Sequence, residues 1–206
     1  MTPTTLSDAE LLRLMVAGDE SAFAALYDEH QGAVYRFALL MSGTANIAEE
    51  VTQEVFLFLV RESHRYDPGR GSLPNYLYGV ARNYVLRSFK RERPYVPLLE
   101  DMEETQEISS TRFLAAEDPL DDYSRNEVIK LVRRAVLTLP ERYREVVVLC
   151  DFQELSCAEA AAALDCPIGT INSRLHRGHA MLVKKLRSVA KVDAKSLDSQ
   201  ALRCFA

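Results

Sequence analysis

The chain has 206 residues, of which 48% are hydrophobic, so it can bury the core of one large domain or of two small ones. It contains 8 glycines and 8 prolines, 8% of its residues are aromatic, and it has no tryptophan. This composition disfavours all-β sandwiches, collagen-like repeats and membrane proteins with aromatic belts, and it favours a helical protein. The net charge of −5 does not by itself indicate a nucleic-acid-binding protein.

The sequence shows no predicted membrane span and no export signal. Its longest apolar run, residues 55–60, is flanked by Glu54 and Arg61 and is far shorter than the roughly 20 residues that cross a bilayer. The first residues lack the basic segment and the long apolar stretch of a signal peptide. We therefore expect a cytoplasmic protein without membrane insertion.

The cysteines are scattered in the second half of the chain: Cys150, Cys157, Cys166 and Cys204. They form no CxxC pair, which is typical of reduced thiols in a cytosolic protein. A zinc site would need two of them together with two histidines: Cys157, Cys166, His176 and His179. Because the spacing of these residues is unlike that of metal ligands, we predict neither a metal nor a cofactor.

Acidic and basic side chains are segregated along the chain. Residues 1–67 carry eleven acidic and four basic side chains, whereas residues 68–97 carry one acidic and six basic ones. Residues 98–124 carry nine acidic side chains and one basic one, and residues 125–191 carry twelve basic and seven acidic ones. We therefore predict an all-α protein with two small helical domains, each with a basic element, joined by a flexible acidic linker.

The first two predicted helices have clear end signals. Ser7 and Glu10 form a capping box in front of a helix that begins at Asp8, and Asp19 or Ser21 can cap the next one. Apolar residues recur at helical spacing from Ser21 until Ser42-Gly43 ends the second helix.

A third helix is predicted from about Asn46. Its apolar stripe comprises Ile47, Val51, Val55, Phe58 and Leu59. Three polar residues, Glu50, Gln53 and Glu54, share a neighbouring face that is either solvated or a binding surface.

A loop and a basic helix complete the N-terminal half. Residues 65–74 contain two prolines and two glycines, which predicts a loop. In the following helix, tyrosines alternate with basic residues: Tyr76, Tyr78, Tyr84, Arg82, Arg87, Lys90, Arg91 and Arg93. Aromatic faces for unstacked bases and cations for phosphates suit single-stranded nucleic acid. The alternative is that the tyrosines belong to the core and the cations form a solvated face.

The C-terminal half has the pattern of a helix-turn-helix. We predict one helix from Asn126 to Leu139 and a second that opens at Pro140, where proline is tolerated. Ser156 and Glu159 make another capping box before a short alanine-rich helix, and residues 165–169 form a turn. A longer basic helix follows that turn, as in helix-turn-helix proteins.

The basic helix has one apolar and one polar face. The predicted buried stripe comprises Ile171, Leu175, Gly178, Leu182 and Leu186. The residues predicted to face outward near its start are Asn172, Ser173, His176 and Arg177, which can read base edges. Lys184, Lys185 and Arg187 can bind phosphates, although a solvated basic helix end is the alternative. Gly178 indicates either a tight packing contact or a slight bend.

These motif blocks resemble the extracytoplasmic-function (ECF) sigma factors of bacterial RNA polymerase. Residues 18–39, 46–61 and 71–93 are similar to domain 2 of that family, and residues 139–186 to domain 4. The resemblance implies a sigma domain 2 helical bundle over 1–93, a linker over 94–124 and a sigma domain 4 over 125–190. The tail, 191–206, has no assigned role.

The resemblance also implies roles for individual residues. Glu50, Gln53 and Glu54 match the face that binds the clamp helices of the largest polymerase subunit, and domain 4 would meet the polymerase flap. The loop and the following helix match the element that captures a base flipped out of the −10 promoter element. Its residues are Asp67, Arg70, Ser72, Asn75, Tyr76, Arg82, Asn83 and Arg87.

The −35 element would be read in the major groove by the basic helix. The residues that match are Thr170, Asn172, Ser173, Arg174, His176 and Arg177, with Arg174 expected on the DNA backbone. The family commonly has Trp at the positions of Val60 and Tyr76 and a basic residue at Asn172. Because Asn favours adenine, the promoter sequence is expected to differ.

The sequence therefore predicts a promoter-specificity subunit that binds core polymerase and promoter DNA and is held by an anti-sigma factor. The alternative is a stand-alone helix-turn-helix regulator, which would have no need of the strand-capturing loop. An all-α enzyme is disfavoured, because the sequence has no P-loop and no nucleophile paired with a base.

Overall fold

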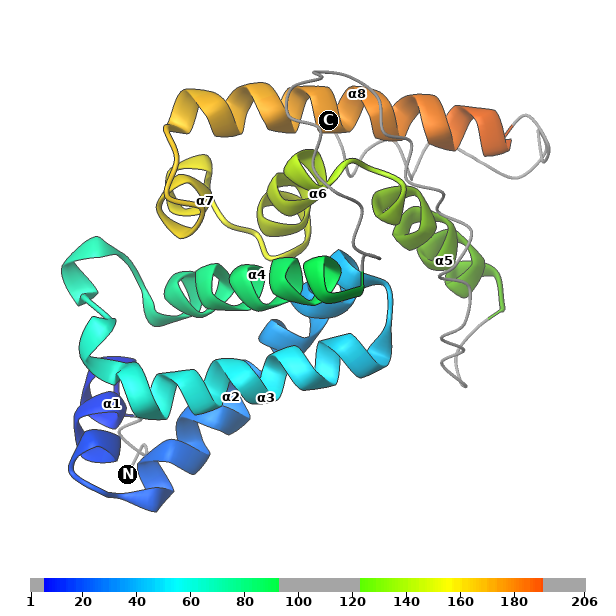
Figure 1. Cartoon of the computed structure of the whole chain (residues 1–206). Helices are drawn as coiled ribbons and strands as arrows, with labels where there is room; N and C mark the ends of the chain where they lie inside the picture. Colours follow the sequence, from blue (N-terminus) through cyan, green and yellow to red (C-terminus); the bar gives the residue numbers. More distant parts are fainter. Residues whose placement is uncertain (1–5, 93–122, 191–206) are drawn as a thin grey trace, which may run out of the picture. The chain divides into compact units, whose positions relative to one another are not determined.

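In a computed structural model of the chain, residues 6–92 and 123–190 are described. The described residues form helices and contain no strand, which confirms the all-α prediction (Figure 1). The chain divides into two compact units, called here the first unit, built from α1 to α4, and the second unit, built around α5, α6 and α8. None of the described helices is long and apolar enough to cross a membrane.

The helices of the first unit begin and end where the sequence signals lie. Helix α1 spans Asp8–Val16, and its capping box is present: the Ser7 amide donates to Glu10 Oε2 at 2.9 Å. Helix α2 spans Glu20–Ser42; Asp19 caps it, and Gly43 ends it in the left-handed conformation. Helix α3 spans Ala45–Glu62.

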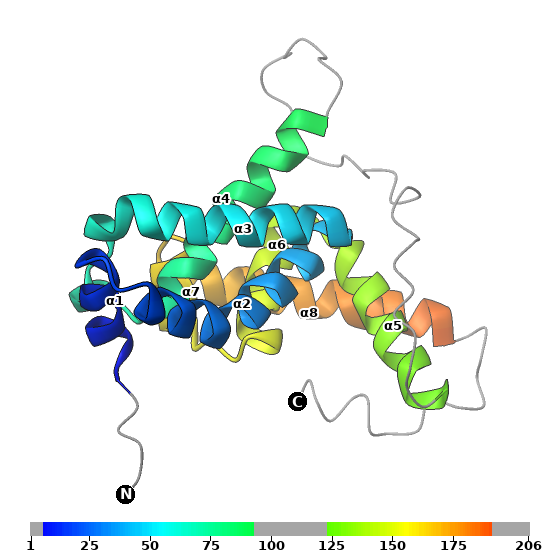
Figure 2. The ribbon, with the colours of Figure 1, turned by 90° about the horizontal axis from the view of Figure 1, so that it is seen from below.

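The core of the first unit lies where α2, α3 and α4 pack against one another, with α1 on α2 (Figure 2). Leu26, Phe37 and Leu59 are fully buried in it. One expected core residue differs: Phe58 is only half-buried, and Phe56 is buried instead, at 2% exposure. The ring of Phe56 lies 4.8 Å from that of Tyr27, so an aromatic contact with α2 holds it inward.

The predicted loop after α3 is partly helical. Two 3-10 turns, η1 (Ser63–Arg65) and η2 (Pro68–Arg70), precede α4, which spans Leu73–Glu92. Pro74 therefore lies in the first turn of α4 rather than in the loop, at a position where its missing N–H has no intrahelical acceptor. Gly71 has a φ of 150°, a conformation that side-chain-bearing residues rarely adopt.

The second unit is formed by α5 (Tyr123–Leu137) and α6 (Glu141–Val147) packed against α8 (Ile168–Ala190). Helix α6 continues into a π-helical turn, η4 (Val148–Phe152), where we expected one regular helix. Helix α7 (Cys157–Ala163) has the predicted capping box, since the Ser156 amide donates to Glu159 Oε2 at 2.9 Å.

Some boundaries differ from those expected. Helix α5 begins at Tyr123, inside the range assigned to the linker, and α8 begins at Ile168, two residues before the predicted start. The rest of the expected linker, from residue 94, and the tail, 191–206, lie outside the described residues.

Gly178 of α8 lies in a tight contact between helices. A Cβ placed on this residue would lie 2.8 Å from Cγ2 of Val147, which is fully buried in α6. Of the two explanations for a glycine inside this helix, the packing contact is the one that the structure supports.

Candidate nucleic-acid interface

The three polar residues expected to bind polymerase lie on the outer side of α3. Glu50 and Gln53 are exposed and Glu54 is half-buried. The Glu50 carboxylate already has a partner from α4, because Arg91 Nη2 lies 2.9 Å from Oε1 and 3.1 Å from Oε2. This ion pair is open to solvent, with 68% of the Arg91 side chain and 47% of the Glu50 side chain exposed.

The loop before α4 is shaped by local hydrogen bonds. The Asp67 carboxylate accepts from the Gly69 amide at 2.9 Å, and Tyr66 Oη donates to the Gly71 carbonyl at 3.2 Å. Asp67, Arg70 and Ser72 themselves are exposed. Burial raises the pKa of Tyr66, and the negative charges of Asp8 and Asp67 add to that effect, so the phenol stays a donor at neutral pH.

Tyr66 also connects this loop to α4. Its ring lies 5.4 Å from that of Tyr76, which is half-buried and whose pKa is raised by burial. Asn75, next to it, is only 6% exposed, so the start of α4 belongs largely to the packed structure.

The tyrosines of α4 have different surroundings, so the two interpretations of their spacing, core packing or base stacking, apply to different residues. Tyr78 is buried, and its ring lies 5.5 Å from that of Phe37, so it is a core residue. Tyr84 is half-buried, and the Arg87 guanidinium lies 5.4 Å from its ring centre.

A small cavity of about 120 Å³ lies beside Tyr84 in the first unit. Its walls are formed by Phe58, Arg65, Val80, Asn83, Tyr84 and Arg87. The structure thus brings together Asn83 and Arg87, both predicted to bind DNA, with Arg65, which the sequence reasoning did not select. The guanidinium of Arg65 lies 6.0 Å from the ring centre of Phe58. Its place as the first, basic residue of the predicted loop was the available signal.

Of the three later α4 residues predicted to bind DNA, Asn83 and Arg87 are exposed and Arg82 is half-buried. Arg93, the last basic residue of that stretch, lies outside the described residues.

Helix α8 presents the predicted reading residues to solvent. Asn172, Ser173, His176 and Arg177 are all exposed, while Ile171, Gly178 and Leu182 on the other face are buried. Leu175 and Leu186 are half-buried members of the same stripe. Ser173 Oγ donates to the Thr170 carbonyl at 2.9 Å, a local bond near the helix start, and Thr170 is half-buried. Lys184, Lys185 and Arg187 are exposed further along the helix.

One arginine of α8 is held by α6, and a second influences a tyrosine there. Arg174 Nη1 lies 3.0 Å from Oε1 of Glu145, a carboxylate whose side chain is only 2% exposed. The neighbouring Arg177 side chain lowers the pKa of the Tyr143 phenol. Arg174 was expected on the DNA backbone; its ion pair gives it a structural partner inside the protein. This contact spans 29 residues, so no local pattern could have revealed it.

The four residues weighed for a zinc site do not come together as ligands over the described part of the chain. His179 instead lies with Nε2 2.7 Å from Oδ2 of Asp151, and Cys157 and Cys166 are half-buried free thiols. Burial raises the pKa of the Cys150 thiol to about 12, with the neighbouring Cys157 as the next cause.

Both halves of the chain match models of known protein families. Residues 26–95 match the family model of sigma-70 region 2, and residues 129–182 match that of sigma-70 region 4. The ECF RNA polymerase sigma factor SigM of Mycobacterium tuberculosis is 32% identical over 184 residues, which cover 87% of this chain and 85% of SigM.

Two solved structures have a similar fold. CnrH, solved with the cytosolic domain of CnrY, matches with a TM-score of 0.62 at 23% identity, covering 92% of this chain and 99% of CnrH. The sigma factor RpoE of Bartonella quintana, solved with the anti-sigma factor NepR, matches with a TM-score of 0.58 at 22% identity, covering 80% of this chain and 96% of RpoE. From the two family matches and the similarity to SigM we conclude that this chain is an RNA polymerase sigma factor of the ECF family.

Proposed function

We propose that this sigma factor binds core RNA polymerase and directs it to promoters by capturing the −10 element as single strand and reading the −35 element as duplex. It performs no chemistry of its own, and polymerase supplies the active site. In this proposal the first unit binds core polymerase and the −10 element, and the second unit binds the −35 element.

The observation that carries the proposal is the two-faced architecture of α8. Four polar side chains stand exposed within the first three turns of α8, and buried residues pack the opposite face against the rest of the second unit. The Arg174–Glu145 ion pair holds the helix against α6. A helix fixed in this way can enter a major groove without rearranging, so the side chains meet base edges in a defined register.

The reading residues differ in what they can recognise. Arg177 can bind guanine through two hydrogen bonds, and Asn172 can do the same with adenine. We propose that Arg174 positions the helix through Glu145 and that Thr170 contributes at the helix start.

The first unit supports capture of the −10 strand. Asp67, Arg70 and Ser72 lie exposed on a loop that its own hydrogen bonds pre-shape, and the half-buried Tyr76 supplies an aromatic ring beside it. Arg65, Asn83 and Arg87 around the neighbouring cavity can hold phosphates of the separated strand. Stacking of a base on an aromatic ring is worth about 1 to 3 kcal/mol, enough to offset the few kcal/mol of extrusion.

Core polymerase would meet the outer face of α3 through Glu50, Gln53 and Glu54, whose acidic and amide groups suit basic clamp helices. We also propose that an anti-sigma factor holds this chain, because the similar RpoE is solved with the anti-sigma factor NepR. The acidic linker, which lies outside the described residues, would run near the polymerase cleft.

Run-off transcription tests the proposal. Purified core polymerase is assayed with and without this protein on a library of promoter fragments, and we expect transcripts that depend on the protein and share two sequence elements. Duplex binding without transcripts would instead identify a stand-alone helix-turn-helix regulator.

Two substitutions in α8 then separate base contacts from phosphate contacts. Arg177→Ala should weaken binding to the preferred −35 duplex by about 5- to 150-fold, equivalent to 1 to 3 kcal/mol, and relax preference at one base. Lys184→Ala is the matched control on the same helix, and it should weaken all duplexes equally and reduce the salt dependence by about 0.9. Equal losses on every sequence for both variants would contradict the role of Arg177.

A pair of substitutions on α3 tests the core-binding face. Gln53→Ala with Glu54→Ala should weaken binding to core polymerase and leave binding to −35 duplex unchanged. Unchanged affinity for core polymerase would remove this assignment.

A further inference from the structure

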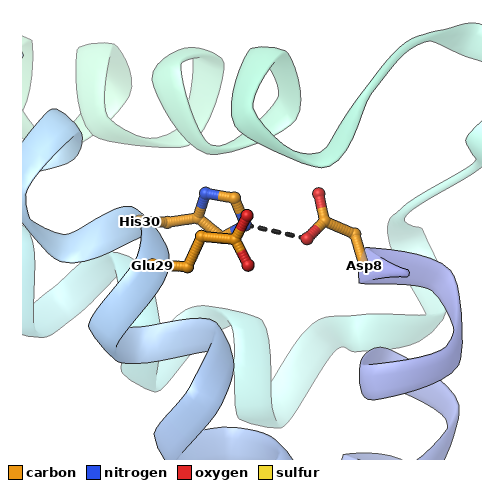
Figure 3. A group of neighbouring side chains, drawn as sticks. All are labelled: Asp8, Glu29 and His30. Carbon is orange, nitrogen blue, oxygen red and sulfur yellow. Dashed lines mark hydrogen bonds and ion pairs between the residues drawn. The ribbon is translucent and has the colours of Figure 1, made fainter. Parts of the chain in front are cut away.

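A cluster of three potential ligands lies where α1 meets α2, away from the residues assigned to DNA or polymerase. Asp8 is the first residue of α1, and Glu29 and His30 are neighbours on α2. Figure 3 shows the Asp8 carboxylate facing the imidazole edge of His30, and the Glu29 carboxylate overlaps the ring in this view. One ligand atom from each residue lies within 4.8 Å of the other two.

The shortest contact in the cluster has a spacing that two ligands of one metal ion would share. Nε2 of His30 lies 3.0 Å from Oδ1 of Asp8, and the two form a hydrogen bond in the structure. Zinc binds imidazole nitrogen and carboxylate oxygen at about 2.0 to 2.2 Å, so tetrahedral neighbours on one ion lie about 3.3 Å apart. His30 and Asp8 could therefore bind one ion with small shifts, and the exposed Glu29 side chain is free to rotate toward it.

Burial gives the cluster a rigid side and an open side. The His30 side chain is 8% exposed, and that of Asp8 is 28% exposed, so the packing of α1 on α2 fixes both. Glu29 is exposed and borders solvent. An ion could enter from that side and keep water as a fourth ligand, as in open zinc sites.

The second carboxylate distinguishes this cluster from the other histidine–carboxylate pairs of the described chain. His179 with Asp151, at 2.7 Å, and His64 with Glu62, at 3.6 Å, are also pairs. Neither pair has a third ligand in comparable reach among the residues that the structure describes. The two carboxylates carry a charge of −2, which a divalent cation matches.

We propose that Asp8, Glu29 and His30 form a binding site for a divalent transition metal ion of the zinc type. The mixed imidazole and carboxylate ligands favour such an ion over Mg²⁺, which prefers oxygen ligands alone. The bound ion would clip α1 to α2. Helix α1 has nine residues and buries two of them, Leu11 and Leu12, so a clip at its first residue would suppress its local opening.

The test is titration of the full, reduced chain with Zn²⁺ by calorimetry, with Mg²⁺ as the comparison ion. We expect one Zn²⁺ per chain, and at least about tenfold weaker binding for His30→Gln and Asp8→Asn. Because Glu29 is exposed, Glu29→Gln should keep the fold and still lose affinity. The matched control is His64→Gln, which removes an exposed histidine that lies beside one glutamate and should bind Zn²⁺ as the native chain does.

Cobalt separates this site from the cysteines. Co²⁺ at the cluster should show only the d–d absorption of nitrogen and oxygen ligands, whereas Co²⁺ on cysteine would add thiolate-to-metal charge-transfer bands. The proposal is overturned by thiolate bands at the first equivalent, by affinity unchanged in Glu29→Gln and His30→Gln, or by no binding of Zn²⁺.

Hydrogen exchange tests whether the bound ion suppresses local opening of α1. Zn²⁺ should slow amide exchange in α1 of the native chain and of His64→Gln, and should leave it unchanged in Glu29→Gln. Equal exchange in α1 with and without bound Zn²⁺ would overturn the inferred effect on the helix.

Discussion

In the first unit, several residues expected to contact DNA are buried or half-buried and belong to the packed structure. In the second unit, the residues expected to read the −35 element are exposed and take little part in packing. Asn75 is 6% exposed and Tyr76 lies against Tyr66, so the start of α4 is both scaffold and candidate site. Asn172 and His176, in contrast, are exposed side chains on a helix whose other face does the packing.

This difference has a mechanistic reason. A helix that reads a closed duplex needs only a protruding edge that fits a groove, so fold and recognition can use opposite faces. A flipped base needs walls around it, and walls are made of side chains that also pack. Substitutions in the second unit should therefore separate stability from binding, and those in the first unit should mix the two.

Tyr78→Ala should give the largest loss of stability. It tests the expectation that α4 contributes to the core as well as to DNA binding. It removes a buried ring that packs against Phe37, so we expect the free energy of unfolding of the first unit to fall by about 3 to 5 kcal/mol. Urea unfolding followed by circular dichroism measures the loss, and hydrogen exchange with mass spectrometry assigns it to residues 6–92.

Tyr84→Ala is the matched control, because Tyr84 is half-buried and touches Phe58 only edge-on, at 6.4 Å between ring centres. It should cost clearly less stability than Tyr78→Ala. Equal losses would mean that both tyrosines are core residues and that neither is available for bases.

Arg174→Met should have the next largest effect on stability. It tests whether stability and DNA binding can be separated in the second unit. This change takes the Arg174 ion pair from the buried Glu145 carboxylate, and breaking a buried pair typically costs about 3 to 5 kcal/mol. Because Arg174 is partly exposed and Glu145 keeps a further interaction, we expect about 2 to 3 kcal/mol. The double variant Arg174→Met with Glu145→Leu should recover most of the loss.

The salt dependence of −35 duplex binding distinguishes a phosphate contact by Arg174 from a role in positioning the helix. A phosphate contact would lower the slope by about 0.9 when it is removed, and a positioning residue would leave the slope unchanged. We expect weaker binding with an unchanged slope, and recovery in the double variant. A reduced slope would return Arg174 to the DNA backbone.

Local sequence signals predicted the helix ends well. Ser7 with Glu10, Asp19 and Gly43 lie at helix ends in the structure as the sequence indicated, because capping depends on residues three or four positions apart. The exposed face of α8 followed equally from helical periodicity.

Contacts between distant residues could not be predicted. The Arg174–Glu145 pair, the exchange of Phe56 for Phe58 in the core and the π-helical turn after Val147 all depend on which helices meet. Tyrosine spacing likewise left open which rings are core, and the answer differed within one helix: Tyr78 is buried and Tyr84 half-buried.

The two glycines of α8 should respond to alanine in opposite directions. At Gly178 the added methyl meets buried Val147 at 2.8 Å, so strain outweighs the gain in helix propensity, and we expect a net loss of about 1 kcal/mol. At Gly169 nothing lies within 4 Å of the added methyl, so Gly169→Ala should stabilise by up to about 1 kcal/mol. Urea unfolding measures both, and a gain at Gly178 would show that α6 and α8 have room to separate.

The smallest expected effect on stability is that of Arg91→Ala, which removes an exposed ion pair between α3 and α4. Exposed pairs contribute about 0.2 to 1 kcal/mol, so the unfolding transition should hardly move. Affinity for core polymerase should respond more clearly, because Arg91 occupies the same Glu50 oxygens that a basic partner would need. Without DNA and at low salt, we expect binding to tighten by about two- to fivefold, the equivalent of 0.4 to 1 kcal/mol.

Glu50→Gln supplies the control, since Arg91→Ala should have no further effect in that background if both act through one carboxylate. High salt should likewise remove the gain, because it screens both the internal pair and the contact with polymerase. If Arg91→Ala instead weakens core binding, Arg91 either holds Glu50 in place or meets polymerase itself, and the Glu50→Gln background distinguishes these. A loss that disappears with Glu50→Gln would make Arg91 a positioning residue, so that α4 would contribute to polymerase binding as well as to DNA capture.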